Sequence, residues 1–192
     1  MKVLTVGFPA GATAVAGALA GGYLGLVTGA VPVDLGVGRR VRPLGPLTTH
    51  IAAPREQVFD VIAAPYLERQ PRAVADKIRV LERGSDMVLA AHRTPVHGGR
   101  VVATTVETVR FTRPAQVDFR LVRGPVPHVV ERFDLSEDEG GTRLDYRGEL
   151  GTDLWGFGAR WGAVVARTWE RTVAASFESV RTEAERRAAR GG

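Results

Sequence analysis

The chain has 192 residues, of which 44% are apolar and 24% charged, a composition typical of one globular domain with an appendage. It contains no cysteine, which excludes disulfides, thiolate nucleophiles and cysteine-ligated metals. The net charge of +5 comes mostly from arginine, which is concentrated at residues 39–42 and 181–190. Because neither cluster is interleaved with aromatic residues, we expect no nucleic-acid partner.

The N-terminal segment carries no charged residue from Val3 to Val33. This run exceeds the ~20 apolar residues that a helix needs to cross a bilayer. It is also longer than the apolar region of a signal peptide, which has roughly 7 to 15 residues. We therefore expect residues 1–33 to be a single-pass membrane anchor, with an uncleaved spanning helix over residues 10–31. Cleavage after Ala30, followed by export, is the alternative.

Glycine recurs at every fourth position of this segment, a spacing that lets membrane helices approach closely. The four positions are Gly17, Gly21, Gly25 and Gly29. They indicate a self-association face, whereas the alternative is low-complexity Gly/Ala sequence without such a role. Arg39, Arg40 and Arg42 outnumber Lys2, so the positive-inside rule predicts that the rest of the chain lies in the cytoplasm.

Residues 34–46 combine arginine with glycine and proline, which predicts a basic linker. A strand is expected from Leu47. The segment "APREQVFDVIAA" that follows has Pro54 and Glu56 in its first turn and an apolar stripe behind them, which predicts a short amphipathic helix. The next segment, "PYLERQPRAVADK", is expected to be an irregular or helical connector.

From residue 78 to residue 150, short runs rich in Val, Thr, Phe and Tyr alternate with turn signals such as "RGSD", "HGGR" and "DEGG", a pattern typical of antiparallel strands. The six predicted strands are 78–83, 87–94, 101–112, 116–122, 128–135 and 142–150. From Leu154 to Val180 the apolar residues step by threes and fours, which predicts a helix of ~30 residues and ~45 Å. Residues 183–192 are expected to form a basic C-terminal tail.

This order of elements resembles the START-like superfamily, also called SRPBCC, which holds the polyketide cyclase/dehydrase and lipid-transport proteins. The likeness covers about residues 47–182 and rests on "IAAPREQVFDVIAAP", "GPVPHVVERFDL" and "GGTRLDY", the second of which also resembles coenzyme Q-binding START proteins. It implies an α+β helix-grip (START/Bet v 1-like) fold, in which a seven-stranded curved antiparallel sheet wraps a long C-terminal helix. Here an N-terminal apolar helix precedes that domain.

The resemblance also implies a deep apolar cavity between the sheet and the long helix. The two-residue period of a strand places Glu131 on the inward face with Phe133, where an unpaired carboxylate is unfavourable. We expect a partner such as an arginine, or a polar ligand group; alternatively, a one-residue slip in register would leave Glu131 at a wet rim. Tyr146 shares the inward face, either to orient a ligand or as a core residue. The residues expected to line the cavity are Phe119, Glu131, Phe133, Tyr146, Trp161, Val165 and Trp169.

Two functions remain open at this stage. The first is a membrane-anchored protein that binds a hydrophobic small molecule, such as a lipid, an isoprenoid quinone or a polyketide-like compound. The alternative is a polyketide cyclase, aromatase or dehydratase that uses Glu131 or His92 as general acid or base. None of the four histidines has the spacing of a zinc-ligand set, and "GVGRRV" lacks the third glycine of a dinucleotide-binding loop, so we expect neither metal nor cofactor.

Overall fold

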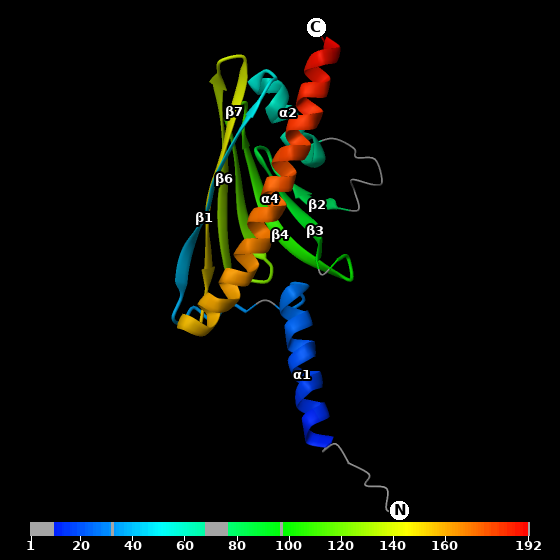
Figure 1. The fold of residues 1–192 in the computed structure, drawn as a ribbon, viewed down its shortest axis with the longest axis vertical. Coiled ribbons are helices and arrows are strands. Elements are labelled where there is room, and N and C mark those ends of the chain that lie inside the picture. The colour runs from blue at the N-terminus through cyan, green and yellow to red at the C-terminus, as the bar shows by residue number, and fades with distance from the viewer. Residues whose placement is uncertain (1–9, 32, 68–76, 97, 192) are drawn as a thin grey trace, which may run out of the picture.

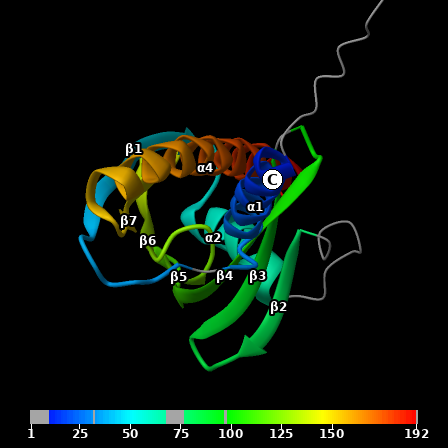
Figure 2. The ribbon, with the colours of Figure 1, turned by 90° about the horizontal axis from the view of Figure 1, so that it is seen from below.

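The computed structural model describes residues 10–31, 33–67, 77–96 and 98–191 (Figure 1). Its elements are α1 (Ala10–Val27), β1 (Arg40–Ile51), α2 (Arg55–Leu67), β2 (Ile78–Arg83), β3 (Met87–Val96), β4 (Val101–Thr112), β5 (Gln116–Arg123), β6 (His128–Asp138), β7 (Gly141–Thr152) and α4 (Trp155–Gly191). Within the described residues, seven antiparallel strands form one sheet in the order β1-β7-β6-β5-β4-β3-β2. The sheet curves around α4 (Figure 2), which confirms the predicted α+β helix-grip fold.

The alternation of side chains along the strands decides which face of the sheet carries the core. On β6 the side chains of Val129, Glu131 and Phe133 are buried, whereas Arg132 between them is exposed. The same period buries Leu144, Tyr146 and Leu150 on β7. These inward faces pack against α2 and α4, so the core lies between the concave side of the sheet and the two helices.

Helix α4 has 37 residues, which corresponds to ~55 Å at 1.5 Å per residue. Its buried face includes Val165, Val173 and Phe177. The helix continues through the segment that was expected to be a basic tail. Glu183 accepts hydrogen bonds from Arg186 and Arg187 at 2.6 to 2.8 Å, and pairs at this spacing stabilise a helix, so the predicted tail is helical instead.

Strand β1 begins at Arg40, well before the predicted start at Leu47, so residues 40–46 are strand rather than linker. The pairing with β7 shifts its register between Leu44 and Leu47. Prolines are tolerated here because β1 is an edge strand, where one side of the backbone needs no sheet partner. The connector expected after α2 falls mainly on residues 68–76, outside the described residues.

The predicted membrane-spanning helix over residues 10–31 is not supported. Among the described residues, no helix is long and apolar enough to cross a membrane. Helix α1 has 18 residues and ends at Val27, a length of ~27 Å against the ~30 Å of a hydrocarbon core. Gly29 lies beyond its end with a φ of 69°, so the four glycines do not share one helix face as predicted. Residues 1–9 of the predicted anchor lie outside the described residues.

The segment between α1 and β1 is attached to the body at two places. Near α1, the Arg123 side chain donates to the backbone oxygens of Gly29 at 2.9 Å and Ala30 at 2.8 Å. Near β1, the Asp153 carboxylate accepts from the amides of Leu35 and Gly36 at 2.7 and 2.9 Å. Arg39 also donates to Asp153, and these hydrogen bonds hold the pKa of the Asp153 carboxyl down at about 2. These bonds therefore hold residues 29–30 and residues 35–39 against the body of the domain.

Candidate functional site

Glu131 is a buried carboxyl group in the middle of the concave face. Its side chain is 5% exposed, and its Oε1 atom accepts hydrogen bonds from the Tyr146 hydroxyl and the Trp169 indole N–H, each at 2.7 Å. Tyr146 is on β7 and Trp169 on α4, so Glu131 joins the sheet to the long helix. Both donors are neutral, and within the described residues no arginine pairs with this carboxyl as the sequence suggested. Its inward position matches the predicted strand period rather than the alternative of a wet rim.

The surroundings of Glu131 keep its proton bound to higher pH than usual. Burial raises the pKa of Glu131 to about 7, and the negative charge of Glu107 acts in the same direction. The hydrogen bonds from Tyr146 and Trp169 oppose this rise in pKa but do not cancel it. Near neutral pH the group therefore exchanges between carboxylic acid and carboxylate, so it can either donate a hydrogen bond to a ligand or accept one.

A second polar cluster lies on β3, β4 and α2. The Nδ1 atom of His92 lies 3.2 Å from Oε2 of the buried Glu107, outside hydrogen-bond geometry, so their attraction is electrostatic. The Thr105 hydroxyl donates to the other Glu107 oxygen at 2.6 Å. On the far side of the imidazole, Nε2 of His92 is 2.9 Å from the Tyr66 hydroxyl. The cluster thus connects four side chains from three elements.

The pKa directions of His92 and Glu107 both favour an ion pair in this second cluster. Burial alone would raise the pKa of Glu107, but the charge of His92 and the hydrogen bond from Thr105 bring it below the ordinary value. Burial likewise lowers the pKa of His92, but the charge of Glu107 outweighs it and raises that pKa overall. Burial raises the pKa of Tyr66, which stays a phenol. A protonated His92 donates to the Tyr66 oxygen through Nε2.

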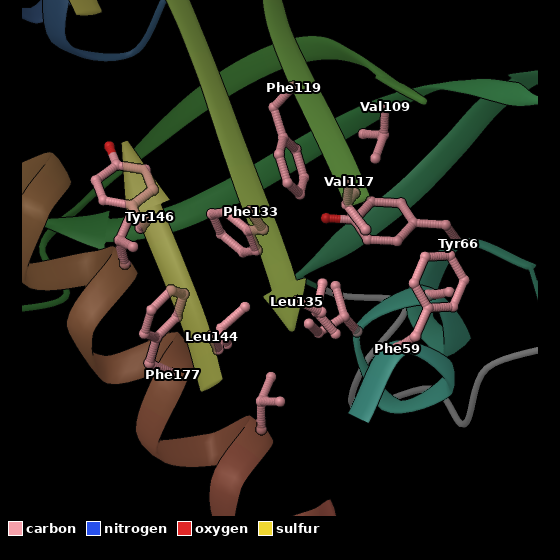
Figure 3. Packing of buried hydrophobic residues seen from close by; sticks show 14 of the residues in the cluster. Phe59, Tyr66, Val109, Val117, Phe119, Phe133, Leu135, Leu144, Tyr146 and Phe177 are labelled. Atoms are coloured by element: carbon pink, nitrogen blue, oxygen red, sulfur yellow. The ribbon is translucent and has the colours of Figure 1, made fainter. Parts of the chain in front are cut away.

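Aromatic rings occupy the space between the two clusters (Figure 3). The centroid of Phe133 lies 5.0 Å from that of Phe119, 5.2 Å from that of Phe177 and 5.7 Å from that of Tyr146. Phe119 also contacts Tyr66 at 6.3 Å, which links the rings to the His92 cluster. The concave side of the sheet therefore carries a packed aromatic core with a titratable group at each side.

The structure brings together most of the side chains that were expected to line the cavity. Phe119, Phe133 and Val165 are buried in the core that surrounds Glu131. Trp161 does not bond to this carboxyl, since its indole donates to the Pro125 oxygen at 2.8 Å and its ring contacts Tyr23. His92, proposed as an alternative acid or base, lies in the second cluster.

Sequence reasoning missed Glu107, Thr105 and Tyr66. Glu107 could have been found, because the strand period that places Val109 inward also places Glu107 on that face. Tyr66 gave no such signal, since it follows Pro65 at the start of a segment of mixed polarity; the structure places Pro65 and Tyr66 in the last turn of α2.

Burial between α4 and the sheet is more complete at one end than at the other. On α2, Val58 and Phe59 are fully buried. Toward the start of α4, Trp161 and Trp169 pack on the core but keep part of their surface exposed. Two surface hollows lie among the described residues, one at Arg167, Glu170, Arg171 and Ala174, and one along β1, β6 and β7, and neither is lined by both α4 and the sheet. The core is therefore less completely buried beside Trp169 than under α2.

A curved antiparallel sheet closed on a long C-terminal helix defines the helix-grip class of ligand-binding folds. Residues 47–185 match the family model described as polyketide cyclase / dehydrase and lipid transport. The chain therefore belongs to this family, within the START-like (SRPBCC) superfamily. A search of curated proteins finds no match.

Several solved structures share the fold. The Zhui aromatase/cyclase of a Streptomyces species is 20% identical with a TM-score of 0.65, over 77% of this chain and 96% of that one. A protein of Thermus thermophilus is 16% identical with a TM-score of 0.56, over 79% and 99% of the two chains. The di-domain aromatase/cyclase StfQ of the steffimycin biosynthetic pathway is also 16% identical with a TM-score of 0.56, over 79% of this chain and 52% of that one. At these identities the likeness establishes the fold alone.

Proposed function

We propose that the chain binds a hydrophobic small molecule in the groove between α4 and the sheet, and that Glu131 recognises a polar group of this ligand. The observation that carries the proposal is the buried Glu131 carboxyl, held by Tyr146 and Trp169 on an otherwise apolar and aromatic face. A buried carboxyl group lowers the stability of a core, so its presence there indicates a functional role. A few polar groups on an apolar wall are also typical of small-molecule sites. Family membership supports this function.

The residues around the groove favour a planar, partly aromatic ligand. Phe119, Phe133 and Trp169 present ring faces and edges, which pack well against other aromatic rings. Glu131 can accept a hydrogen bond from a phenol or donate one to a carbonyl, depending on its protonation. A polyketide-like aromatic or a quinone headgroup offers such groups on a flat ring, whereas a simple acyl chain does not.

The test compares related naphthalenes. Titration of the full chain with 2-naphthol and with naphthalene, followed by tryptophan fluorescence, is expected to show tighter binding of the hydroxyl compound. Glu131→Leu should remove this preference and keep binding of naphthalene, whereas Glu149→Gln, an exposed change on β7, should leave both affinities unchanged. Equal affinities for the two compounds in the unaltered protein would contradict the proposed role of Glu131. Failure of both compounds and of an apolar dye to bind would contradict ligand binding itself.

A second function, cyclisation of a poly-carbonyl chain, is favoured by the presence of two titratable clusters on one face. Their charges influence each other, since Glu107 and His92 both act on the pKa of Glu131. In such a reaction the Glu131 carboxylate would take a proton from a methylene between two carbonyls. The resulting carbanion would attack a carbonyl carbon of the same chain, and protonated His92 would give its proton to the oxygen.

Turnover of a synthetic poly-β-ketone tests this second function. Glu131→Gln and His92→Gln should each lower the rate of cyclised product at least tenfold if these groups transfer protons, a conservative value for general acid–base catalysis. Glu149→Gln serves as the control. No product above the spontaneous background, with ligand binding intact, would leave the chain a binding protein.

A further inference from the structure

An exposed apolar patch covers the end of the domain where α4 begins. It is formed by large hydrophobic residues that are more than a third exposed. These residues, which we call the end patch, are Leu35, Val37, Val41, Leu154, Trp155, Phe157 and Val164. Phe157 is 77% exposed and Trp155 56% exposed. Apolar side chains that gather at one place on a surface mark an interaction site more often than single exposed ones do.

The backbone holds the centre of the end patch in a fixed and strained shape. Leu154 and Trp155 have φ values of 67° and 49°, a left-handed conformation that residues other than glycine rarely adopt. Their amides donate to the oxygens of Val37 and Gly38 at 2.8 and 3.0 Å. The Trp155 ring lies against Gly38, where a β-carbon would come within 2.4 Å of it. Strain that the structure maintains in this way is typical of functional segments.

Arginines without partners border the end patch. Along α4, Phe157, Arg160, Val164 and Arg167 follow one another at intervals of three or four residues, so exposed apolar and basic side chains alternate on one side of the helix. Arg40 is exposed beside Val41. In the part of the chain that the structure describes, these three arginines make no ion pair, whereas Arg39 nearby is neutralised by Asp34 and Asp153.

The apolar surface continues onto α1. This helix leaves the body at the end where α4 begins (Figure 1). Its Tyr23 and Leu24 are more than a third exposed, and the Tyr23 ring packs on Trp161 of α4. The end patch therefore lies close to the C-terminal end of the segment that carries no charge from Val3 to Val33.

We propose that the end patch docks on the surface of an anionic lipid bilayer, with Trp155 and Phe157 at the depth of the headgroups and Arg40, Arg160 and Arg167 facing the lipid phosphates. Exposed aromatic side chains flanked by arginine are the combination that partitions into a membrane interface. A second copy of the chain is disfavoured as the partner, because the unpaired arginines would then face one another. The proposal is independent of the ligand-binding function and needs no membrane-spanning helix.

The absence of cysteine allows a direct test with the full chain. When Phe157→Cys is labelled with a polarity-sensitive fluorophore, its fluorescence emission should shift to the blue on addition of phosphatidylcholine vesicles that contain phosphatidylglycerol. Vesicles of phosphatidylcholine alone should cause a much smaller shift. Val122→Cys on β5, where the native side chain is 60% exposed, is the matched control and should not shift. Equal shifts at both positions, or no shift at position 157, would overturn the proposal. So would a shift at position 157 that appears without vesicles and grows with protein concentration, because it would indicate a second copy.

Co-sedimentation with the same anionic vesicles gives the second measurement. Phe157→Ser should weaken partitioning about tenfold, because the variant lacks the aromatic ring that the bilayer would bury. Arg160→Gln should weaken it about fivefold, whereas Arg93→Gln, an exposed arginine on β3, should have little effect. Thermal unfolding of each variant shows that the domain is folded. If all the variants bind as the unaltered chain does, α1 alone accounts for the binding and the end patch is not a docking surface.

Discussion

The indole N–H of Trp169 on α4 donates to Oε1 of Glu131 on β6 at 2.7 Å. This bond joins the long helix to the sheet, so the protonation of one carboxyl depends on the position of a helix. A ligand that enters beside Trp169 would meet both partners of the bond. The same geometry makes the protonation of Glu131 sensitive to changes on α4, which leads to the first prediction.

Trp169→Phe should raise the pKa of Glu131 above its present value of about 7, because the indole hydrogen bond stabilises the carboxylate. The free energy of unfolding should fall by about 1 kcal/mol from the lost hydrogen bond. A carbon-13 NMR titration of the glutamate carboxyls measures the pKa. Trp161→Phe removes an indole that donates to the Pro125 oxygen and should leave the titration of Glu131 unchanged. A pKa that moves equally in both variants would contradict the assigned role of Trp169.

Glu131 should make the protein less stable as the pH rises from about 4.5 to 7. In the folded state the pKa of this carboxyl is about 7, against 4.5 for an ordinary glutamate, so between these values the folded chain binds the proton that the unfolded chain has lost. Stability then decreases with pH, and the full difference corresponds to about 3 kcal/mol. Glu131→Gln keeps the shape of the side chain but cannot ionise, so it removes this contribution.

Denaturant unfolding at pH 4.5, 6 and 8 checks this prediction. The stability of the glutamine variant relative to the unaltered protein should improve by about 3 kcal/mol from pH 4.5 to pH 8. His92, whose pKa is raised in the folded state, also makes stability depend on pH near the upper end of this range. Its stabilising contribution is present below pH 6.5 and is lost above the folded pKa, but it is common to the variant and the unaltered protein. Glu149→Gln is the control. A stability difference that does not change with pH would show that Glu131 titrates normally.

The sequence was sufficient for the fold because its signals were local and repeated. The strand alternation around Phe133 and the helix period around Trp169 each depend on residues close in sequence, and both predicted the correct inward face. The partners of Glu131 could not be derived in this way. Which donors reach one oxygen depends on how α4 crosses β6 and β7, and that geometry arises only when distant elements pack.

Two predicted element boundaries were wrong for different reasons. Residues 40–46 were interpreted as a linker because prolines usually interrupt strands, but the edge position of β1 permits them, which depends on how the sheet assembles. The arginines after Glu183 were interpreted as a tail, but ion pairs at helical spacing stabilise them as part of α4. The second boundary could have been predicted from local spacing, whereas the first could not.

Glu107→Gln should lower the pKa of His92 and that of Glu131 at the same time. Burial lowers the pKa of His92, and the charge of Glu107 is the main effect that raises it above the ordinary value, so the loss of that charge should lower it. The same charge adds to the effect of burial in raising the pKa of Glu131. Stability should fall by about 3 kcal/mol, because one partner of a buried ion pair is lost.

Proton and carbon NMR titrations report the two pKa values in one sample. Glu137→Gln, an exposed change at the end of β6, provides the control and should move neither value. If the pKa of His92 falls while that of Glu131 stays constant, the two clusters are electrically independent. The proposed joint action of Glu131 and His92 on one substrate would then lose its support.

Gly29→Ala should loosen the attachment of α1, whereas Gly36→Ala should not. Both glycines have positive φ, 69° and 66°, so each substitution costs about 1 kcal/mol from the left-handed backbone. They differ in their surroundings, because a β-carbon on residue 29 would lie 2.4 Å from the Thr104 oxygen, while one on residue 36 would meet nothing within 4 Å. The clash should break the bond from the Thr104 amide to the Thr28 oxygen, now 3.2 Å long. Hydrogen exchange at the Thr104 amide should therefore accelerate in Gly29→Ala alone, and equal exchange in the two variants would show that this contact does not hold α1 against the sheet.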